Sequence, residues 1–280
     1  MIPATFDYEV AESTEHALEL LGGREDAKLL AGGHSLLPAM KLRLARPSLL
    51  VDIGRLRDLS YVRDAGDHIA IGALTRHKDV VEAPLLQEHC PLVPSAAGQV
   101  GDPQVRHRGT IGGSLAHGDP ASDLPTVMLT LDAEMVIRGP SGERIVPAAQ
   151  FFSGVFQTAL EPTELLVEIR VPKLPSTTGC SYMKMSRRAQ DWATVAVATL
   201  VERRNGSIGR AAIGLTNMGA TPLRATQAEE AIAGGAAIVD AAPLIVSGSE
   251  PSSDTAASAE FRRHLATVLG RRALEEAAGR

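Results

Sequence analysis

The sequence predicts an α+β fold built from two small mixed units and a third unit that begins with strands and ends with helices. Three observations support this. Helix-like and strand-like runs alternate over residues 1–53, a turn-rich polar segment interrupts the chain at residues 173–179, and three strand-like runs followed by two helical ones come after it. Alternation in one region and grouped elements in another are typical of separate packed units.

The first unit, residues 1–53, is expected to hold two helices and two strands. Residues 13–23 (STEHALELLGG) predict a short helix, because Ser13 or Thr14 can cap its start and Gly22 can end it. The remaining runs follow in chain order: a buried strand at residues 28–33 (KLLAGG), a helix at residues 35–44 and a strand at residues 48–53.

The second unit, residues 54–176, mixes strands with short helices. Thr75 can cap a helix after the strand at residues 68–74, and Ser122 can cap another helix after a glycine-rich stretch. The other expected elements are helical pieces at residues 84–101, a hairpin at residues 133–148 and a strand at residues 164–172.

The third unit, residues 177–280, contains strands first and helices last. The strands are expected at residues 180–186, 194–204 and 209–217, and the helices at residues 223–234 and 259–279. In the last helix, five residues at near-helical spacing mark an apolar face: Phe261, Leu265, Val268, Leu269 and Leu274.

Composition and charge narrow the possible functions. Hydrophobic residues make up 44% and aromatic residues only 3%, so the core is expected to consist of Leu, Val, Ile and Ala. The net charge of −5 gives no attraction for nucleic acid or for an anionic membrane surface. No apolar run approaches the roughly 20 residues of a membrane span, and the N-terminus lacks signal-peptide features. We therefore expect a cytoplasmic protein.

The cysteines and histidines indicate no metal centre. Cys90 and Cys180 are far apart in the sequence, outside any C-x-x-C motif, and are expected to be reduced thiols. Two cysteines also exclude a self-contained iron–sulfur cluster, which needs about four thiolates. His107 and His117 lack metal-ligand spacing, and neither H-E-x-x-H nor a G-x-S-x-G nucleophile motif occurs.

Two glycine pairs stand beside hydroxyl residues. AGGHS (residues 31–35) leads from a strand into a helix, and GTIGGS (residues 109–114) is expected to open a small-residue turn. Glycines permit positive φ and close backbone approach, so successive N–H groups can point into one concavity, and a following helix adds free N–H groups. Two such loops would suit a pyrophosphate, with hydroxyl donors at Ser35, Thr110 and Ser114. A plain turn is the alternative for each loop, and the P-loop and Rossmann fingerprints are absent.

An acidic stretch, HGDPASDLP (residues 117–125), follows the second loop directly. Asp119 begins an Asp-Pro turn, and Asp123 can simply cap its helix. The functional alternative is that one of these carboxylates accepts hydrogen bonds from ribose or adenine groups.

A basic stretch, YMKMSRRAQDWA (residues 182–193), contains the only tryptophan of the chain. It predicts either an exposed strand end with Trp192 in the core, or a ligand contact. In the second interpretation Lys184 lies near phosphate or flavin, and Asp191 and Trp192 lie near an aromatic ring.

The order of these motifs resembles a known family. AGGHS, DPQVRHRGTIGGS, GDPASD, Y-x-K…DWA and GLTN follow one another as in the FAD-binding medium subunits of molybdenum hydroxylases. Within that family, the chain is most similar to the medium subunits of aerobic, molybdenum–copper carbon monoxide dehydrogenases. The resemblance covers essentially the whole chain. It implies a vanillyl-alcohol-oxidase-type (PCMH-type) fold, with two α+β FAD-binding subdomains at residues 1–53 and 54–176 and a C-terminal domain at residues 177–280 with a three-stranded antiparallel sheet and helices.

The resemblance also implies the site. The two glycine loops would grip the FAD pyrophosphate, Asp123 would contact the adenosine half, and Lys184 would lie near the cofactor. Trp192 stands where several relatives have a tyrosine beside the isoalloxazine, so an aromatic wall remains without the phenol. The implied cofactor-binding residues are Ala31, Gly32, Gly33, His34, Ser35, Thr110, Ile111, Gly112, Gly113, Ser114, Asp119, Asp123, Lys184, Asp191 and Trp192. No acid–base catalyst and no metal ligand are expected on this chain.

The implied reaction is electron transfer within a larger enzyme. A large subunit with the molybdenum cofactor would oxidise the substrate, and a small subunit would pass electrons through [2Fe–2S] clusters to non-covalent FAD on this chain. An external acceptor such as a quinone would then reoxidise the FAD. The resemblance further implies a dimer of heterotrimers in the cytoplasm, or at the inner face of the membrane through the complex. Carbon monoxide is the preferred substrate, with purines, nicotine-like heterocycles and aldehydes as alternatives.

Two other functions stay open from the residues themselves. One is a stand-alone flavin oxidoreductase with its own substrate base; the other is a non-enzymatic assembly subunit whose loops are only turns. His34 could also tether FAD covalently, as a histidine does in some flavin oxidases of this broad fold, whereas the family resemblance implies a loop former. If the loops hold pyrophosphate, Gly33→Val or Gly112→Val is expected to abolish FAD retention by blocking the approach of the backbone to phosphate.

Overall fold

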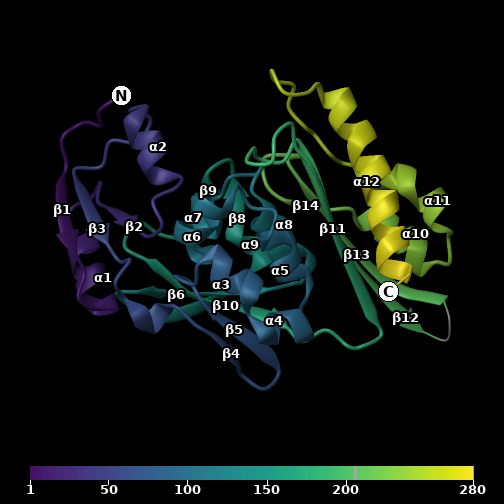
Figure 1. Ribbon diagram of the computed structural model, residues 1–280, viewed down its shortest axis with the longest axis horizontal. Helices are drawn as coiled ribbons and strands as arrows, with labels where there is room; N and C mark the ends of the chain where they lie inside the picture. The colour runs from purple at the N-terminus through teal and green to yellow at the C-terminus, as the bar shows by residue number, and fades with distance from the viewer. Residues whose placement is uncertain (205–206, 280) are drawn as a thin grey trace.

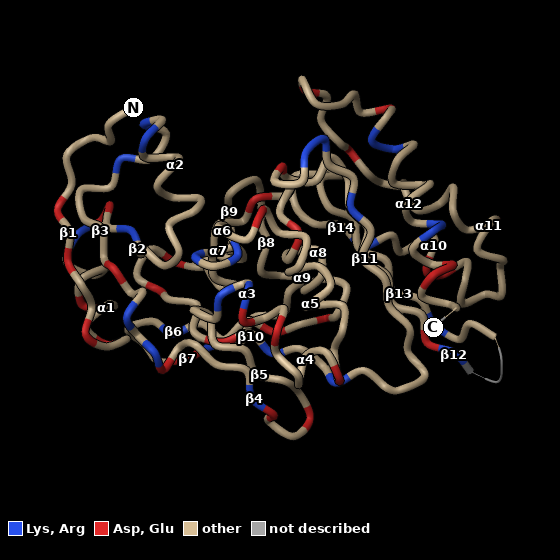
Figure 2. The backbone as a smooth tube through the Cα atoms, viewed as in Figure 1, with Lys and Arg blue, Asp and Glu red and all other residues tan. Residues whose placement is uncertain are grey.

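The computed structural model describes residues 1–204 and 207–279 and arranges them as three units in a row (Figure 1). The N-terminal unit lies at one end, the central unit in the middle, and the C-terminal unit with its long last helix at the other end. Lys and Arg residues alternate along the backbone of all three units with Asp and Glu residues (Figure 2). No helix in the described part of the chain is long and apolar enough to span a membrane.

The N-terminal unit is a three-stranded parallel sheet in the order β1-β3-β2, with two helices. Its elements are β1 (Asp7–Val10), α1 (Thr14–Gly22), β2 (Lys28–Leu30), α2 (Leu36–Lys41) and β3 (Leu49–Asp52). Ser13 caps α1 as expected, accepting a hydrogen bond from the His16 N–H, but the helix ends one residue later, with Gly23 as its C-cap. The prediction of a buried strand at KLLAGG is wrong in part, because β2 is a three-residue edge strand with Lys28 exposed.

The central unit is built on a five-stranded antiparallel sheet in the order β4-β5-β10-β6-β7. Its strands are β4 (Val62–Asp64), β5 (His68–Gly72), β6 (Glu134–Gly139), β7 (Gly142–Pro147) and β10 (Leu165–Pro172), with a separate two-stranded ribbon of β8 (Phe152–Gly154) and β9 (Gln157–Thr158). Its helices are η1 (Arg57–Leu59), α3 (His77–Glu82), α4 (Pro84–His89), α5 (Leu92–Ala97), α6 (Pro103–Arg108), α7 (Ile111–His117), α8 (Asp123–Thr130) and α9 (Ala148–Phe151). The expected hairpin is confirmed as β6–β7.

Two expectations for the central unit are wrong. GTIGGS, expected to open a turn, instead leads into the helix α7, and a further short helix, α6, precedes it. Thr75 does not cap α3, whose N-cap is Arg76. The Thr75 hydroxyl instead accepts from the Tyr61 N–H and donates to the Tyr61 carbonyl, and so joins the two chain segments that flank β4 and β5.

The central sheet is buried on both faces. Met135 and Ile137 of β6 belong to the large core under the central helices, whereas Val136 between them belongs to the core of the N-terminal unit. This alternation follows from the two-residue period of a strand. The N-terminal unit is therefore packed against the back of the sheet, which fixes the start of α2 relative to α7.

The C-terminal unit is a four-stranded antiparallel sheet in the order β11-β12-β13-β14, so the three expected strands are joined by a two-residue fourth. Its elements are β11 (Thr178–Met185), β12 (Val195–Arg204), β13 (Ser207–Thr216), β14 (Leu223–Arg224), α10 (Thr226–Ala233), α11 (Ile238–Ala241), η2 (Ala242–Val246) and α12 (Ala259–Gly279). Helices α10 and α12 cover one face of this sheet, and α8 of the central unit covers the other.

The first four residues of β12 are all apolar, and the packing of the strand explains why. Val195 and Val197 pack in the C-terminal core, while Ala196 and Ala198 pack in the core of the central unit. A strand buried on both faces loses the alternation of apolar and polar residues. The central and C-terminal units therefore share one continuous interior.

The expected apolar face of α12 is only partly right. Leu274 is buried, but Phe261 is 46% exposed. The residues turned inward are mostly small: Arg262, Ala266, Gly270, Ala273, Leu274 and Ala277. A Cβ atom on Gly179 of β11 would overlap the Ala277 carbonyl. Small residues let the helix lie close to the sheet, and a pattern of large apolar side chains does not reveal them.

Candidate functional site

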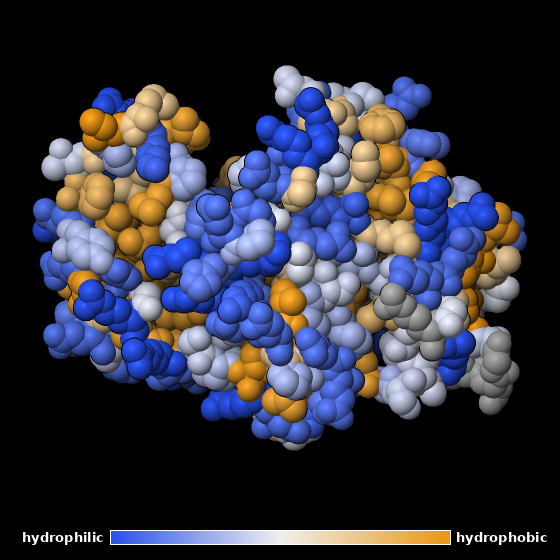
Figure 3. All heavy atoms as spheres, in the orientation of Figure 1, coloured by the Kyte–Doolittle hydropathy of each residue, from blue (hydrophilic) through white to orange (hydrophobic). Residues whose placement is uncertain are grey.

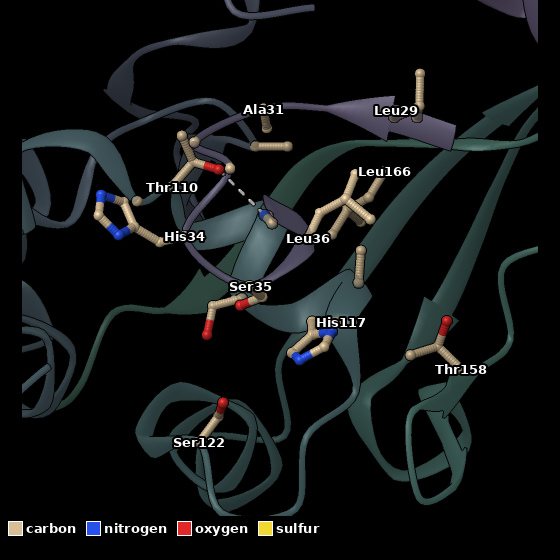
Figure 4. Close-up of a pocket in the computed structure, with 18 of the residues that line it drawn as sticks. Leu29, Ala31, His34, Ser35, Leu36, Thr110, His117, Ser122, Thr158 and Leu166 are labelled. Atoms are coloured by element: carbon tan, nitrogen blue, oxygen red, sulfur yellow. Dashed lines mark hydrogen bonds between the residues drawn. The ribbon is translucent and has the colours of Figure 1, made fainter. Parts of the chain in front are cut away.

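A cleft of about 920 Å³ is lined by residues of all three units. In the space-filling view a notch separates the N-terminal unit from the C-terminal unit (Figure 3), and a close-up shows residues that line the cleft (Figure 4). Ligand pockets usually measure roughly 300–1,000 Å³, so this volume suits a large ligand. All of the expected site residues line the cleft except Ile111 and Asp119.

The AGGHS loop carries a series of free backbone donors. It joins β2 to α2 and bends at Gly33, which has a φ of +77°. Within the described residues, the N–H groups of residues 32–36 have no protein acceptor, whereas the Leu37 N–H already donates to the Gly33 carbonyl. His34 is exposed beside these donors, and Figure 4 shows it with Ser35 on the same loop. Successive free N–H groups in a turn form a concave site for an anion.

The TIGGS segment is helical, which corrects the expectation of a turn. Thr110 is the N-cap of α7, and its hydroxyl accepts a hydrogen bond of 3.2 Å from the Gly113 N–H (dashed in Figure 4). The Ile111 and Gly112 N–H groups donate to the carbonyls of Thr75 and Ala73 at 2.9 and 2.8 Å. The first N–H groups of α7 are therefore already satisfied by protein acceptors.

Helix α7 faces the cleft with its side and not with its N-terminal N–H groups. Gly113 is exposed and Ser114 is partly exposed on the wall of the cleft, whereas the Ile111 side chain is fully buried in the central core. The free N–H groups therefore belong to the AGGHS loop, and the TIGGS segment contributes an exposed glycine and hydroxyl-bearing side chains.

The AGGHS loop and the residue that precedes the TIGGS segment, Gly109, are in contact. Gly32 is required for this contact, and Gly112 is required for the packing of α7 against Ala73. A Cβ atom on Gly32 would lie 2.8 Å from the Gly109 Cα, and one on Gly112 would lie 2.6 Å from the Ala73 carbonyl oxygen. Both distances are too short for non-bonded atoms. Gly112→Val is therefore expected to damage the fold itself, so only Gly33 can be tested for a ligand contact.

A buried ion pair lies at the wall of the cleft. The Asp123 and Lys184 side chains are 6% and 4% exposed, with 2.9 Å between carboxylate and ammonium. The Tyr182 hydroxyl donates to the other Asp123 oxygen at 2.6 Å, and the Lys184 ammonium also donates to the Gln99 carbonyl at 3.0 Å. Burial raises the pKa of Asp123, while Lys184 and Tyr182 act in the opposite direction. The pair joins α8 to β11, 61 residues apart in the sequence.

The remaining expected residues differ in their surroundings. Trp192 is 61% exposed, so its placement in the core is wrong. Asp191 accepts hydrogen bonds from Arg188 on the same loop. Asp119 lies outside the lining of the cleft and accepts from the Ala121 N–H at 2.8 Å, as in an Asp-initiated turn.

Some lining residues carried no distinct sequence signal. The rings of His117 at the end of α7 and Phe156 on the β8–β9 turn lie 5.0 Å apart, and burial lowers the pKa of His117. Phe156 has a φ of +56°, which is unusual for a bulky residue. Only a known backbone conformation could have singled it out.

The two cysteines and the metal-ligating side chains indicate no further centre. Cys90 and Cys180 are both buried, neither forms a disulfide, and burial raises the pKa of the Cys90 thiol. Over residues 1–204 and 207–279, no group of three or more His, Cys, Asp or Glu side chains is arranged to hold a metal ion.

His77 is a third lining residue without a distinct sequence signal. It begins α3, is 3% exposed, and its Nδ1 has no hydrogen-bond partner in the described part of the molecule. Burial lowers the pKa of His77 to about 4, and the nearby His34 and Arg106 act in the same direction. The imidazole is therefore neutral at physiological pH.

The depressed pKa of His77 predicts a loss of stability in acid. Between about pH 6.5 and pH 4 the unfolded chain binds a proton at His77 and the folded chain does not, so the free energy of unfolding falls by up to about 3 kcal/mol. Urea unfolding at the two ends of this range should show a smaller drop for His77→Gln than for the unaltered protein. Replacing the exposed His264 by Gln is the control and should leave the drop unchanged. Equal drops in all three proteins would contradict the prediction.

The comparisons with known proteins agree with this geometry. Residues 4–174 match the family described as FAD binding domain in molybdopterin dehydrogenase, and residues 180–277 match the CO dehydrogenase flavoprotein C-terminal domain. The carbon monoxide dehydrogenase medium chain of Hydrogenophaga pseudoflava is 42% identical over 99% of this chain and 98% of its own length. The 6-hydroxypseudooxynicotine dehydrogenase complex subunit alpha of Paenarthrobacter nicotinovorans is 40% identical over 99% and 96%.

A solved structure is similar over the same length. The carbon monoxide dehydrogenase from Hydrogenophaga pseudoflava that lacks the Mo-pyranopterin moiety superposes with a TM-score of 0.97 at 43% identity, covering 100% of this chain and 99% of that chain. Fold and family match thus define an FAD-binding flavoprotein of mixed α and β structure. The chain belongs to the FAD-binding medium subunits of the carbon monoxide dehydrogenase-like molybdenum hydroxylases, and so is a subunit of an oxidoreductase.

Proposed function

We propose that this chain is the electron-transfer subunit of an aerobic carbon monoxide dehydrogenase. A large partner subunit holds the molybdenum cofactor and oxidises the substrate, and a small partner subunit passes electrons through [2Fe–2S] clusters to FAD on this chain. A quinone then accepts the electrons. The observation that carries the proposal is the cleft that all three units line, with the free N–H groups of residues 32–36 and the exposed indole of Trp192 on its surface.

The FAD pyrophosphate is assigned to the space beside the AGGHS loop. The N–H groups of residues 32–36 supply donors for phosphate oxygens, because they have no other acceptor in the described structure. Ser35 and Ser114 add hydroxyl donors, and the exposed Gly113 leaves room for a phosphate against α7. His34 is assigned a place at the rim of this site without a covalent bond.

Asp123 and Lys184 are assigned a place beneath the cofactor. A carboxylate offers about four acceptor positions, and the Tyr182 hydroxyl and the Lys184 ammonium use two of those on Asp123. Asp123 can therefore still accept from the adenosine half of FAD. Trp192 supplies a flat apolar wall for the isoalloxazine, and bound FAD supplies the redox chemistry while the protein orients it.

Non-covalent FAD is the first testable consequence. We expect the purified complex to show flavin absorbance and to release all of its flavin into the supernatant after acid precipitation, because no bond joins His34 to the cofactor. Mass spectrometry of the denatured chain should give the mass of the unmodified polypeptide. Flavin that stays in the pellet, or a mass increase that maps to His34, would show a covalent tether instead.

The electron route can be tested in the assembled complex. Carbon monoxide should reduce the iron–sulfur clusters whether or not FAD is present, whereas reduction of an added quinone should require FAD. The experiment compares the complete complex with a complex stripped of FAD and with one to which FAD has been returned. Undiminished quinone reduction by the stripped complex would overturn the proposed role of this chain.

A second candidate substrate class follows from the comparisons. The 6-hydroxypseudooxynicotine dehydrogenase subunit is nearly as similar as the carbon monoxide dehydrogenase subunit, at 40% against 42% identity. A nicotine-type heterocycle is therefore the alternative to carbon monoxide, and the same assay with each substrate separates the two.

We also propose that the protein is cytoplasmic and that the native complex is a dimer of heterotrimers. Sedimentation of the native complex would measure this stoichiometry.

A further inference from the structure

The segment that carries Trp192 is held by hydrogen bonds from two distant elements. Trp192 is followed by Ala193 and Thr194, which lead into β12. The Asn217 side-chain amide donates to the Ala193 carbonyl at 2.8 Å and to the Thr194 carbonyl at 3.3 Å. The Arg262 guanidinium of α12 donates to the same Thr194 carbonyl. The backbone directly after Trp192 is therefore held by both the end of β13 and the last helix.

Asn217 is itself hydrogen-bonded to the loop that leads to Asp123. It is the last residue of the GLTN motif and lies in the left-handed region, with a φ of +63°. Its N–H donates to the Pro120 carbonyl at 2.9 Å, which joins it to the GDPASD loop before Asp123. Asparagine adopts this backbone conformation more readily than most residues. One residue thus connects the loop before α8 to the segment that follows Trp192.

Arg262 is a rigid partner in this arrangement. Its side chain is 1% exposed, and it also donates to the Ser252 carbonyl at 3.1 Å and to the Asp254 carboxylate at 2.6 Å. A buried guanidinium with several acceptors has little freedom to move. It therefore holds the Thr194 carbonyl in one position relative to α12.

We propose that Asn217 and Arg262 are positioning residues that set the place of the Trp192 indole against the flavin. The inference rests on the proposed function, since it requires FAD in the cleft. Trp192 is 61% exposed and, among the described residues, its indole N–H has no hydrogen-bond acceptor. The position of the indole therefore depends on the backbone beneath it, and that backbone is fixed by the bonds from Asn217 and Arg262.

The single tryptophan makes the proposal directly measurable, because fluorescence excited at a wavelength that the indole absorbs and the three tyrosines do not reports on Trp192 alone. Two variants remove the amide donors: Asn217→Gly, which tolerates the left-handed backbone, and Asn217→Ser, which retains a small polar side chain. In the FAD-free full-length chain, both should lower the fluorescence anisotropy of Trp192 and raise its quenching by acrylamide. The control is Arg271→Gln, which alters an exposed arginine of α12, the helix that carries Arg262. This variant should change neither quantity.

With FAD bound, the same variants should alter the flavin. An indole that is no longer held in one position would contact the flavin less well, so we expect the FAD dissociation constant to rise about tenfold and the flavin midpoint potential to shift. Unchanged anisotropy and quenching in either Asn217 variant, once folding is verified by circular dichroism, would overturn the positioning role.

If the proposed place of FAD beside Trp192 is wrong, the experiment gives a different result. If adding FAD to the unaltered chain leaves the fluorescence of Trp192 unchanged, the indole does not face the flavin and the assignment of Trp192 is wrong. That result is independent of the anisotropy measured without FAD. The two measurements therefore separate a wrong positioning role from a wrong cofactor site.

Discussion

Replacing Asp123 by alanine is expected to lower the free energy of unfolding by about 3–5 kcal/mol. The Lys184 ammonium, 4% exposed, would lose its counter-charge, and the Tyr182 hydroxyl would lose its acceptor. A buried charge without a partner is among the most destabilising changes known in folded proteins. Urea unfolding of the full chain, followed by circular dichroism, measures the loss.

Two controls identify the cause of this effect. The double variant Asp123→Leu with Lys184→Met should regain most of the stability, because an apolar pair of similar volume can replace a buried ion pair. Glu275→Ala, which breaks the exposed pair with Arg271, should cost less than about 1 kcal/mol. If Asp123→Ala costs no more than Glu275→Ala, the pair is open to solvent and its proposed place beneath the cofactor is wrong.

Gly33→Val is expected to weaken FAD binding by about tenfold or more, the equivalent of losing one charge-assisted hydrogen bond. Gly33 has a φ of +77° in the middle of the free N–H groups of residues 32–36. A branched side chain disfavours this conformation, so the loop would relax and its donors would no longer converge. Fluorescence titration of the FAD-free chain with FAD gives the dissociation constant.

The matched control is Gly66→Val. Gly66 has a φ of +92° on an exposed turn, and a Cβ atom at this position would have no other atom within 4 Å. The variant therefore carries similar backbone strain away from the cleft. It should lower stability without changing the FAD dissociation constant. Equal FAD affinity for Gly33→Val and the unaltered chain would contradict the assignment of this loop to phosphate.

The sequence revealed the parts of the site that depend on local chemistry. The AGGHS loop could be recognised because glycines, a hydroxyl and a following helix are adjacent in the chain, and the structure gives this loop free N–H groups. The TIGGS segment was misread as a turn because its glycines disfavour a helix by propensity. Tertiary packing overrides that propensity, because only a glycine at position 112 fits against Ala73.

Contacts between distant segments could not be predicted from local patterns. Nothing near Asp123 in the sequence indicates an ion pair with Lys184, and nothing near Asn217 indicates hydrogen bonds to the carbonyls after Trp192. Each depends on how β11, β12 and β13 lie against α8, which is a property of the whole fold. The proposed domain boundary at residues 176 and 177 stays a prediction.

The shared interior of the central and C-terminal units has a consequence for how such a subunit can change over evolution. Ala196 and Ala198 of β12 belong to the central core, and Gly214 of β13 leaves no room for a Cβ beside Thr126 and Thr130 of α8. The two matched regions of the chain are therefore not interchangeable modules. A C-terminal region transplanted from a distant relative would carry the wrong surface for α8, so both regions are expected to be inherited as one block and to unfold in a single cooperative step.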